Sequence, residues 1–547
     1  MNMTKLNSMK SLRRSSALAL VAGVAGLAGF AGVTTQAEAA SPPNALVMAW
    51  NIDAISTFDP AQIGEAATNE IVQNICDPLV DFDPADETKI LPKMAKSWDV
   101  SEDGLQITFH LRDDLKFDSG EKATAGDLAW SLQRVVKLGF GNAATLTEYG
   151  FVKDNVDSTI VAPDDTTLIF KLDKPYPANL ILSAIAANRV SGLLNQKVLM
   201  ANQVDNDLGN KYLATRSDCV GPYKLARWNP AEVVLLQASD NYWGEAPKLK
   251  QVLIRHVSEA GTQRLLLEKG DIDIARDLTP EDLTDLEAQG KATASRVLKP
   301  SLFYWNFNNA DPIFSNDKVR HAMRYLIDYD GLAKTVMKIV GEPRASFVQL
   351  GAIGALDEKQ GQPFKLDVEK AKELLKEAGY PDGFESTMFI GTAPYAAPIA
   401  QSIQDAAAKA GVKIKIERMA NAQLFSRIRG REFQTSLMGW QTMVPDAHGN
   451  ASRQIYNPDN RMEAKQTMYP SWRASYFDEA VNKKVDDALF EKDDAKRNQM
   501  YFDLQKEMME KGPQAYMFQL YNVAGVSKAM KNWSWNGFRV YYDTAAK

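Results

Sequence analysis

Strict alternation of apolar and polar residues marks the strands of this chain. From residue 105 to residue 111 the two kinds alternate without a break. A period of two is the pattern of a β-strand with one buried face, and it places His110 on the polar face. Strand-like runs also occur at residues 232–236 and 252–257. Helical segments separate these runs, so the sequence predicts mixed α/β domains.

Other segments carry the spacing of a helix. One apolar face is predicted from residues at positions i, i+3, i+4 and i+7, namely Val319, Ala322, Met323 and Leu326. A second helix is expected to begin after Asp367, which suits an N-cap. It should end at Gly379, because Pro381 follows and cannot continue a helix.

The first residues of the chain have the pattern of a sorting signal. Four basic residues precede an uncharged run at residues 17–33, and Ala37-Glu38-Ala39 supplies the small residues that signal peptidase recognises. We therefore expect residues 1–39 to be a cleaved signal peptide and the mature chain to be soluble in the periplasm. An uncleaved anchor is the alternative, and the many Ala and Gly residues of the run disfavour it.

Length and composition narrow the classes of protein. The 547 residues exceed what one hydrophobic core usually serves, so two or three domains are expected. A hydrophobic content of 45% indicates a folded globule, and a formal charge of -6 lacks the basic excess of a nucleic-acid-binding protein. Cys76 and Cys219 are the right number for one disulfide in an oxidising compartment. Two separate buried thiols remain the alternative.

Catalytic and metal-binding signatures are scarce. The sequence contains no HExxH, GxSxG, P-loop or CxxC motif, and its four histidines are dispersed, with His448 the one candidate metal ligand. Residues 139–144 loosely match a dinucleotide fingerprint, but a helical segment precedes them, so a loop is the preferred interpretation. The acidic segments 81–87 and 271–273 lack EF-hand spacing and are interpreted as solvated turns. We expect neither an enzyme nor a bound cofactor or metal.

Six segments carry a family resemblance, and they occur in the family's order. They read LPKMAKSWDVSEDGLQITFHLRDDLKFDSGEKATAGDLAWSLQR at 91–134, CVGPYKL at 219–225, NYWGEAP at 241–247, LLLEKGDIDIA at 265–275, NFNNADPIFSNDKVRHAM at 306–323 and DVEKAKELLKEAGYPDG at 367–383. Together they resemble the family 5 extracellular solute-binding proteins, the oligopeptide, dipeptide and nickel type receptors of bacterial ABC importers.

The resemblance implies a hinged, two-lobed periplasmic binding protein of type II, in the large class with an extra subdomain in lobe one. Lobe one is expected at residues 40–305 and again at 515–547, and lobe two at 306–514. The apolar runs at 302–305 and 515–526 suit strands that cross between the lobes. The resemblance also implies a monomer without cofactor. Its partners would be a small ligand and the permease subunits at the inner membrane, and ligand contacts would favour the closed form.

The resemblance places the ligand cleft at three segments. Its candidate ligand-binding residues are Glu65, Tyr304, Trp305, Trp440, Gln441 and Thr442. Trp440 is the strongest candidate, because indole offers a broad apolar face and one N–H donor. Of Tyr304 and Trp305, strand alternation predicts that only one faces the cleft.

Two departures from the family bear on the ligand. Peptide-binding relatives carry an Asp three residues after the matching Trp, to pair with the peptide ammonium group, and Met443 occupies that place here. An Arg expected before Pro394 is replaced by Ala393. Asp446 and Arg427 are the remaining candidates for charged ligand contacts, and Arg429 and Arg431 lie near Arg427. A peptide or peptide-like solute is therefore expected, with an opine or oligosaccharide as the alternative, and an exported hydrolase as a less favoured one.

Overall fold

The computed structural model describes residues 41–547. The predicted signal peptide lies outside these residues. One sheet of eleven strands dominates the fold. Its strands run in the order β15 (Lys413–Arg418), β14 (Glu385–Ile390), β16 (Thr435–Gln441), β12 (Ala292–Phe307), β17 (Gln514–Ser527), β11 (Ile274–Ala275), β1 (Ala45–Trp50), β10 (Gln251–His256), β9 (Val233–Ala238) and β8 (Tyr223–Asn229). Strand β13 (Gly341–Pro343) pairs with β17 outside this order.

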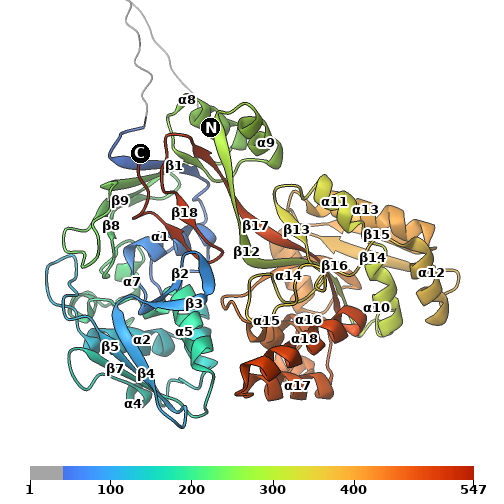
Figure 1. Cartoon of the computed structure of the whole chain (residues 1–547), viewed down its shortest axis with the longest axis horizontal. Coiled ribbons are helices and arrows are strands. Elements are labelled where there is room, and N and C mark those ends of the chain that lie inside the picture. Colours follow the sequence, from blue (N-terminus) through green and yellow to red (C-terminus); the bar gives the residue numbers. More distant parts are fainter. Residues whose placement is uncertain (1–40) are drawn as a thin grey trace, which may run out of the picture. The chain divides into compact units, whose positions relative to one another are not determined.

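The two long strands β12 and β17 connect the halves of this sheet (Figure 1). Strand β12 pairs with β16 through residues 301–307, while the far end of β17 pairs with β11. Both strands were expected from the apolar runs at 302–305 and 515–526, and both are confirmed. The strands predicted at 105–111, 232–236 and 252–257 are also confirmed, as β5 (Gln106–Leu111), β9 and β10.

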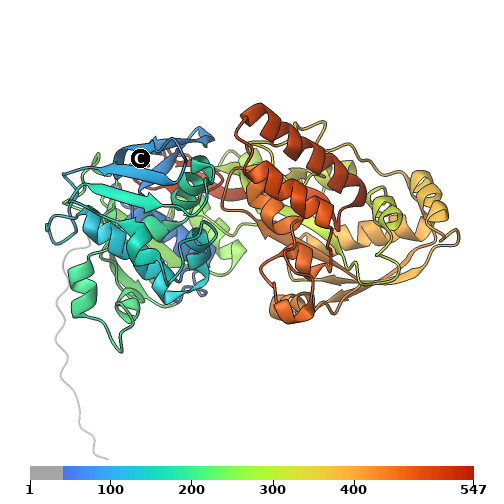
Figure 2. The same ribbon diagram turned by 90° about the horizontal axis from the view of Figure 1, so that it is seen from below.

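Helices cover both faces of the sheet around β12, β14 and β16. One face packs against α10 (Asp317–Arg324), α12 (Val368–Glu377) and α13 (Ala396–Lys409). The other face packs against α14 (Asn421–Arg429), α15 (Ala447–Gln454), α17 (Glu479–Leu489) and α18 (Asp494–Lys511). Helices α17 and α18 lie side by side, in orange-red and red in Figure 2. Because both faces are covered, side chains of either orientation are buried at residues 300–307 of β12 and 435–438 of β16.

Helix α12 ends where the sequence predicts. Asp367 accepts a hydrogen bond from the Lys370 N–H at 2.9 Å, and Gly379 has φ +92° in the turn that follows. The prediction for α10 was two residues too long, since this helix ends at Arg324 and Leu326 lies in the turn that follows. Leu326 is nevertheless buried in the same core as Val319.

A smaller four-stranded sheet, formed by the N-terminal part of the sequence, has a separate core. Its strands are ordered β4 (Ala95–Val100), β5 (Gln106–Leu111), β7 (Thr167–Lys171) and β6 (Ile160–Val161), and they pack against α2 (Ala125–Leu138) and α5 (Ala178–Ala187). Two-stranded sheets join β2 (Val80–Asp83) to β3 (Asp86–Pro92) and β18 (Ser534–Trp535) to β19 (Val540–Tyr541). The remaining helices are α1 (Ala66–Ile75), η1 (Gly141–Ala143), α3 (Ala144–Thr147), α4 (Val156–Thr159), η2 (Arg189–Ser191), α6 (Gln196–Ala201), α7 (Asn210–Leu213), α8 (Ala260–Lys269), α9 (Pro280–Ala288), α11 (Tyr329–Lys334), η3 (Met462–Ala464) and α16 (Pro470–Arg473).

The two cysteines are joined in the structure. Cys76 follows α1, Cys219 precedes β8, and their Cα atoms lie 5.2 Å apart. This distance is in the usual range for a disulfide. Both residues are buried, so the bond ties α1 to a segment far away in the sequence from inside the core.

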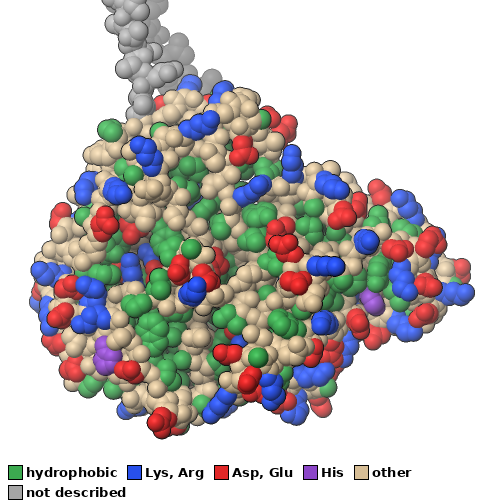
Figure 3. Space-filling model, in the orientation of Figure 1, with side chains coloured by type: hydrophobic (Ala, Val, Ile, Leu, Met, Phe, Trp, Pro, Cys, Tyr) green, Lys and Arg blue, Asp and Glu red, His purple; other side chains and the backbone are tan. Residues whose placement is uncertain are grey.

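Two acidic residues that were interpreted as parts of solvated turns are instead buried. Asp81 forms an ion pair with Arg539 of the C-terminal segment. Asp273 accepts the Val47 N–H at 2.7 Å and lies 2.9 Å from the ammonium group of Lys547. The interpretation was wrong because the charged partners come from the distant C-terminus. On the face drawn in Figure 3, by contrast, acidic and basic side chains are interspersed.

Candidate ligand-binding cavity

Trp440 lies near the end of β16, half-buried beside the core formed by α14, α15, α17 and α18. Its indole N–H donates to the Asn450 side-chain oxygen at 3.2 Å. The Asn450 amide in turn donates to Gln349 at 2.6 Å. These two hydrogen bonds fix the orientation of the ring, and one edge of the indole is therefore already occupied by the protein.

The chain after β16 borders a cavity of about 260 Å³. Trp440, Gln441, Thr442 and Met443 line one side, together with residues of α15. The other side is lined by η1, α3 and α5 of the N-terminal part, including Leu180. Met443 also packs against the core to which Leu180 belongs. The cavity is therefore built from two segments that belong to different cores of the fold.

An ion pair joins the two sides of this cavity. Glu148, which directly follows α3, pairs with Arg453 of α15. The guanidinium of Arg453 also lies over the ring of Tyr469, 4.8 Å from its centroid. Both Glu148 and Arg453 line a second cavity of about 280 Å³, which adjoins the first at Tyr149 and His448.

His448 is uncharged at neutral pH in this environment. Burial lowers the pKa of its imidazole to about 4. One ring nitrogen, Nδ1, lies 2.9 Å from the hydroxyl of Tyr501. No group of three or more His, Cys, Asp or Glu side chains among residues 41–547 is placed to hold a metal ion.

Asp446 is engaged by the protein itself. It caps α15 by accepting the His448 N–H at 2.7 Å, and it forms two hydrogen bonds of 2.8 and 2.9 Å with Arg497. Both side chains are only 7% exposed. Its carboxylate oxygens therefore already have partners, whereas a ligand anchor usually keeps an oxygen free for the ligand.

Tyr304 and Trp305 lie in the hydrophobic core, 2% and 1% exposed. Tyr304 packs against Tyr516, with ring centroids 5.4 Å apart, and burial raises its pKa to about 12. Trp305 packs on the opposite face of the sheet, against Phe307. Alternation along β12 thus separates the two side chains as expected, but neither lines the cavity, because helices cover both faces.

Glu65 and Arg427 also lie away from the cavity. Glu65 precedes α1 and accepts a hydrogen bond from the Ser56 hydroxyl at 3.4 Å. The guanidinium of Arg427 lies 4.4 Å from the ring centroid of Phe389. Of the predicted site residues, the structure thus brings Trp440, Gln441 and Thr442 together, with Met443 beside them.

Sequence reasoning missed the opposite wall. Gly141, Asn142 and Ala144, from the segment interpreted as a loop, line the cavity as part of a short helical turn. The five residues that follow include Thr145 and Glu148, which also line it. The one available signal was the dense run of Gly and Asn after a helix end, which is typical of a backbone turn near a site.

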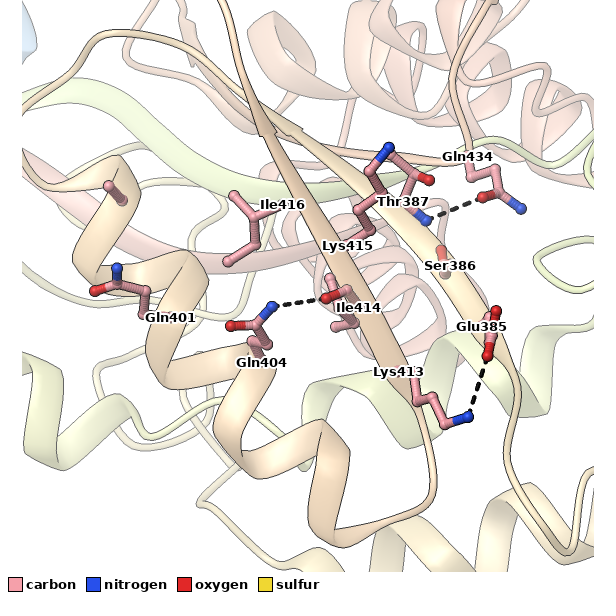
Figure 4. Close-up of a pocket in the computed structure, with 11 residues that line it drawn as sticks. Glu385, Ser386, Thr387, Gln401, Gln404, Lys413, Ile414, Lys415, Ile416 and Gln434 are labelled. Atoms are coloured by element: carbon pink, nitrogen blue, oxygen red, sulfur yellow. Dashed lines mark hydrogen bonds and ion pairs between the residues drawn. The ribbon is translucent and has the colours of Figure 1, made fainter.

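A larger cavity lies elsewhere in the fold. It measures about 880 Å³ and is bordered by α13, β14 and β15 (Figure 4). Its charged residues form ion pairs within the protein. Lys413, for example, lies 3.1 Å from Glu385. It has no residue in common with the segments that the sequence singled out.

Comparison with known proteins identifies the family. The model of the bacterial extracellular solute-binding proteins, family 5, matches residues 89–461. This is more than half of the chain. The chain belongs to this family. It is therefore a solute-binding receptor of the ABC importer type and not an enzyme, in agreement with the six sequence motifs.

Individual relatives match over nearly the whole length. The probable D,D-dipeptide-binding periplasmic protein DdpA of Escherichia coli (strain K12) is 26% identical over 505 residues, which cover 91% of this chain and 93% of the relative. DppA from Helicobacter pylori, solved with the peptide STSA, has a TM-score of 0.74 and 24% identity, with 91% and 98% of the chains covered. AgaA from A. tumefacien R10, solved with agropinic acid, has a TM-score of 0.71 and 26% identity, with 90% and 96% covered.

These matches establish the α/β fold of a two-lobed periplasmic binding protein. The relative DdpA is named as a periplasmic protein. Within residues 41–547, none of the helices has the length and apolar character needed to cross a membrane.

Proposed function

We propose that this protein is a periplasmic receptor that captures a small peptide or peptide-like solute and delivers it to a membrane permease. Residues 1–39 would direct export as a cleaved signal peptide. The mature chain would act as a monomer, with lobe one at residues 40–305 and 515–547 and lobe two at residues 306–514. On this division, β12 and β17 form the hinge between the lobes.

The observation that carries the proposal is the cavity at Trp440. It takes one wall from each proposed lobe, so a bound solute would contact both and favour closure. Its volume of about 260 Å³ is just below the usual range of about 300–1,000 Å³ for small-molecule sites. With the adjoining cavity, the space suits a solute of about dipeptide size.

Two relatives support different ligand classes. DdpA is named for D,D-dipeptides, which favours a short peptide. AgaA was solved with agropinic acid at the same level of identity, so an opine is the second candidate. Met443 stands where the family resemblance implies an acidic residue in peptide-binding members, which makes a direct ligand test necessary.

The decisive experiment is mass spectrometry of the solute released from natively purified protein. Isothermal titration with free L,L- and D,D-dipeptides, agropinic acid and an oligosaccharide then gives the ligand class. Micromolar or tighter binding of a dipeptide supports the proposal. Binding of agropinic acid alone would transfer the assignment to opines, and binding of none of these solutes would contradict it.

Trp440→Ala tests whether the cavity is the binding site. Loss of the indole surface should cost about 1–3 kcal/mol of binding free energy, a weakening of roughly five-fold to more than a hundred-fold. Trp98→Ala is the matched control, because Trp98 is also half-buried but lies on β4, away from the cavity. Equal affinity of the two variants would remove Trp440 from the site.

A further inference from the structure

The walls of the Trp440 cavity carry one charge of each sign. Among the described residues that line it, Glu148 and Arg453 are the only acidic and basic side chains, since His448 is neutral. They face each other from opposite walls and form an ion pair. The side chain of Arg453 is only 15% exposed and that of Glu148 is 41% exposed. The site as a whole is thus electrically neutral, with its charges separated between two segments.

Asn188 adds an unpaired acceptor to the wall that carries Glu148. Its amide N–H donates to the Thr145 hydroxyl at 3.1 Å, but its side-chain oxygen has no hydrogen-bond partner in residues 41–547. The residue is 8% exposed and lines the cavity. A buried acceptor without a donor is unfavourable, so this oxygen is suited to receive an N–H from a bound solute.

The acidic groups expected from the sequence are not free to play this part. Met443 lines the cavity without a charge, and Asp446 is held by Arg497. Glu148 is therefore the one carboxylate in the lining that can meet a ligand cation. Arg453 is correspondingly the one guanidinium that can meet a ligand carboxylate.

We propose that Glu148 and Arg453 recognise the charges of a zwitterionic solute by exchanging their mutual ion pair for contacts with it. The ligand carboxylate takes the place of the Glu148 carboxylate at Arg453. The freed Glu148, together with the Asn188 oxygen, receives the ligand ammonium group. This inference rests on the proposed function, because it assumes that the solute binds in this cavity.

Charge balance explains why a zwitterion is favoured. An anionic solute paired with Arg453 would leave Glu148 without its partner, and a cationic solute would do the same to Arg453. Such an unpaired charge is costly at Arg453, whose side chain is only 15% exposed, and less costly at Glu148, which is 41% exposed. A neutral sugar would have to bind beside the intact pair. Only a solute with both charges replaces each half of the pair with an equivalent, charge-assisted hydrogen bond.

The test compares three forms of one peptide, namely free alanyl-alanine, its N-acetyl derivative and its C-terminal amide, in both the L,L and D,D configurations. Wild type should bind the free dipeptide best. Glu148→Gln should weaken binding of the free dipeptide at least tenfold and improve binding of the anionic N-acetyl form. Arg453→Gln should weaken the free dipeptide and the N-acetyl form, whereas Arg453→Lys should recover part of the affinity. Tenfold corresponds to about 1.4 kcal/mol.

Glu377→Gln is the matched control, because Glu377 also forms an ion pair, with Lys318, and lines neither cavity. Thermal unfolding of every variant separates lost binding from lost folding. If wild type binds the free dipeptide and both Glu148→Gln and Arg453→Gln bind it with unchanged affinity, the pair does not recognise the ligand charges. The proposed receptor function is then unaffected. If wild type binds neither dipeptide but binds a neutral solute, the proposed ligand class and this inference both fail.

Discussion

Replacing Asp446 should damage folding more than ligand recognition. Its carboxylate makes two hydrogen bonds with Arg497 in a site where both side chains are 7% exposed, and it caps α15. Removing one partner of a buried ion pair costs about 3–5 kcal/mol, because the other charge stays buried. The lost cap adds about 1 kcal/mol. Asp446→Ala should therefore lower the free energy of unfolding by about 4–6 kcal/mol.

Three further variants separate these contributions, namely Asp446→Asn, Arg497→Met and their combination. Asp446→Asn keeps a capping oxygen and loses only the charge. Its free energy of unfolding should therefore be about 1 kcal/mol higher than that of Asp446→Ala. Combining Asp446→Asn with Arg497→Met removes both charges and should cost less than the sum of the single variants. Urea denaturation followed by tryptophan fluorescence measures the wild type, the single variants Asp446→Ala, Asp446→Asn and Arg497→Met, and the double variant.

A different outcome would make Asp446 a ligand-binding residue. If Asp446→Asn unfolds at the wild-type urea midpoint but binds the solute at least tenfold more weakly, Asp446 contacts the ligand. Its pairing with Arg497 would then be a property of the empty site alone.

Two other outcomes are expected from the fold. The Cys76–Cys219 bond spans a sequence separation of 143 residues, so chain entropy predicts that Cys76→Ala/Cys219→Ala loses up to about 5 kcal/mol of unfolding free energy. A reducing agent should destabilise wild type and leave this variant unchanged; equal sensitivity of both would contradict the structural bond. Burial holds the pKa of His448 near 4, whereas an unfolded His titrates near 6.5, so the unfolded chain binds more protons between these values. The free energy of unfolding of the wild type should fall as the pH drops from about 6.5 to about 4. That of His448→Gln should fall less over the same range. Identical pH profiles of the two proteins would argue against a buried neutral imidazole.

The sequence predicts those features that local interactions determine. Helix α12 has the expected ends because a capping side chain and a left-handed glycine act within a few residues of the helix. Strand β5 follows from uninterrupted alternation. Helix α10 was predicted too long because Leu326 is buried after the helix has ended, and an apolar period does not distinguish the two cases.

The candidate site was predicted on one wall only. Trp440 and its neighbours were expected from what the family resemblance implies, whereas Glu148, Asn188 and Arg453 carry no local signal. Their proximity arises when α3 and α5 pack near α15, and this packing depends on tertiary contacts. Tyr304 and Trp305 illustrate the converse. Aromatic residues on a strand look alike in the sequence whether they face a cleft or, as here, helices on both faces of a sheet.

If the proposed exchange is right, the ion pair between Glu148 and Arg453 also links recognition to closure. It joins segments that belong to different proposed lobes, so it favours the closed form even without a solute. A solute that exchanges with this pair favours closure only by the difference between its own contacts and those it replaces. A neutral variant of Glu148 should then increase the population of the open form in the absence of solute. Closure of such a variant would depend on the solute alone. The population of its closed form should therefore rise more on adding solute than that of the wild type, even if the variant binds the solute more weakly.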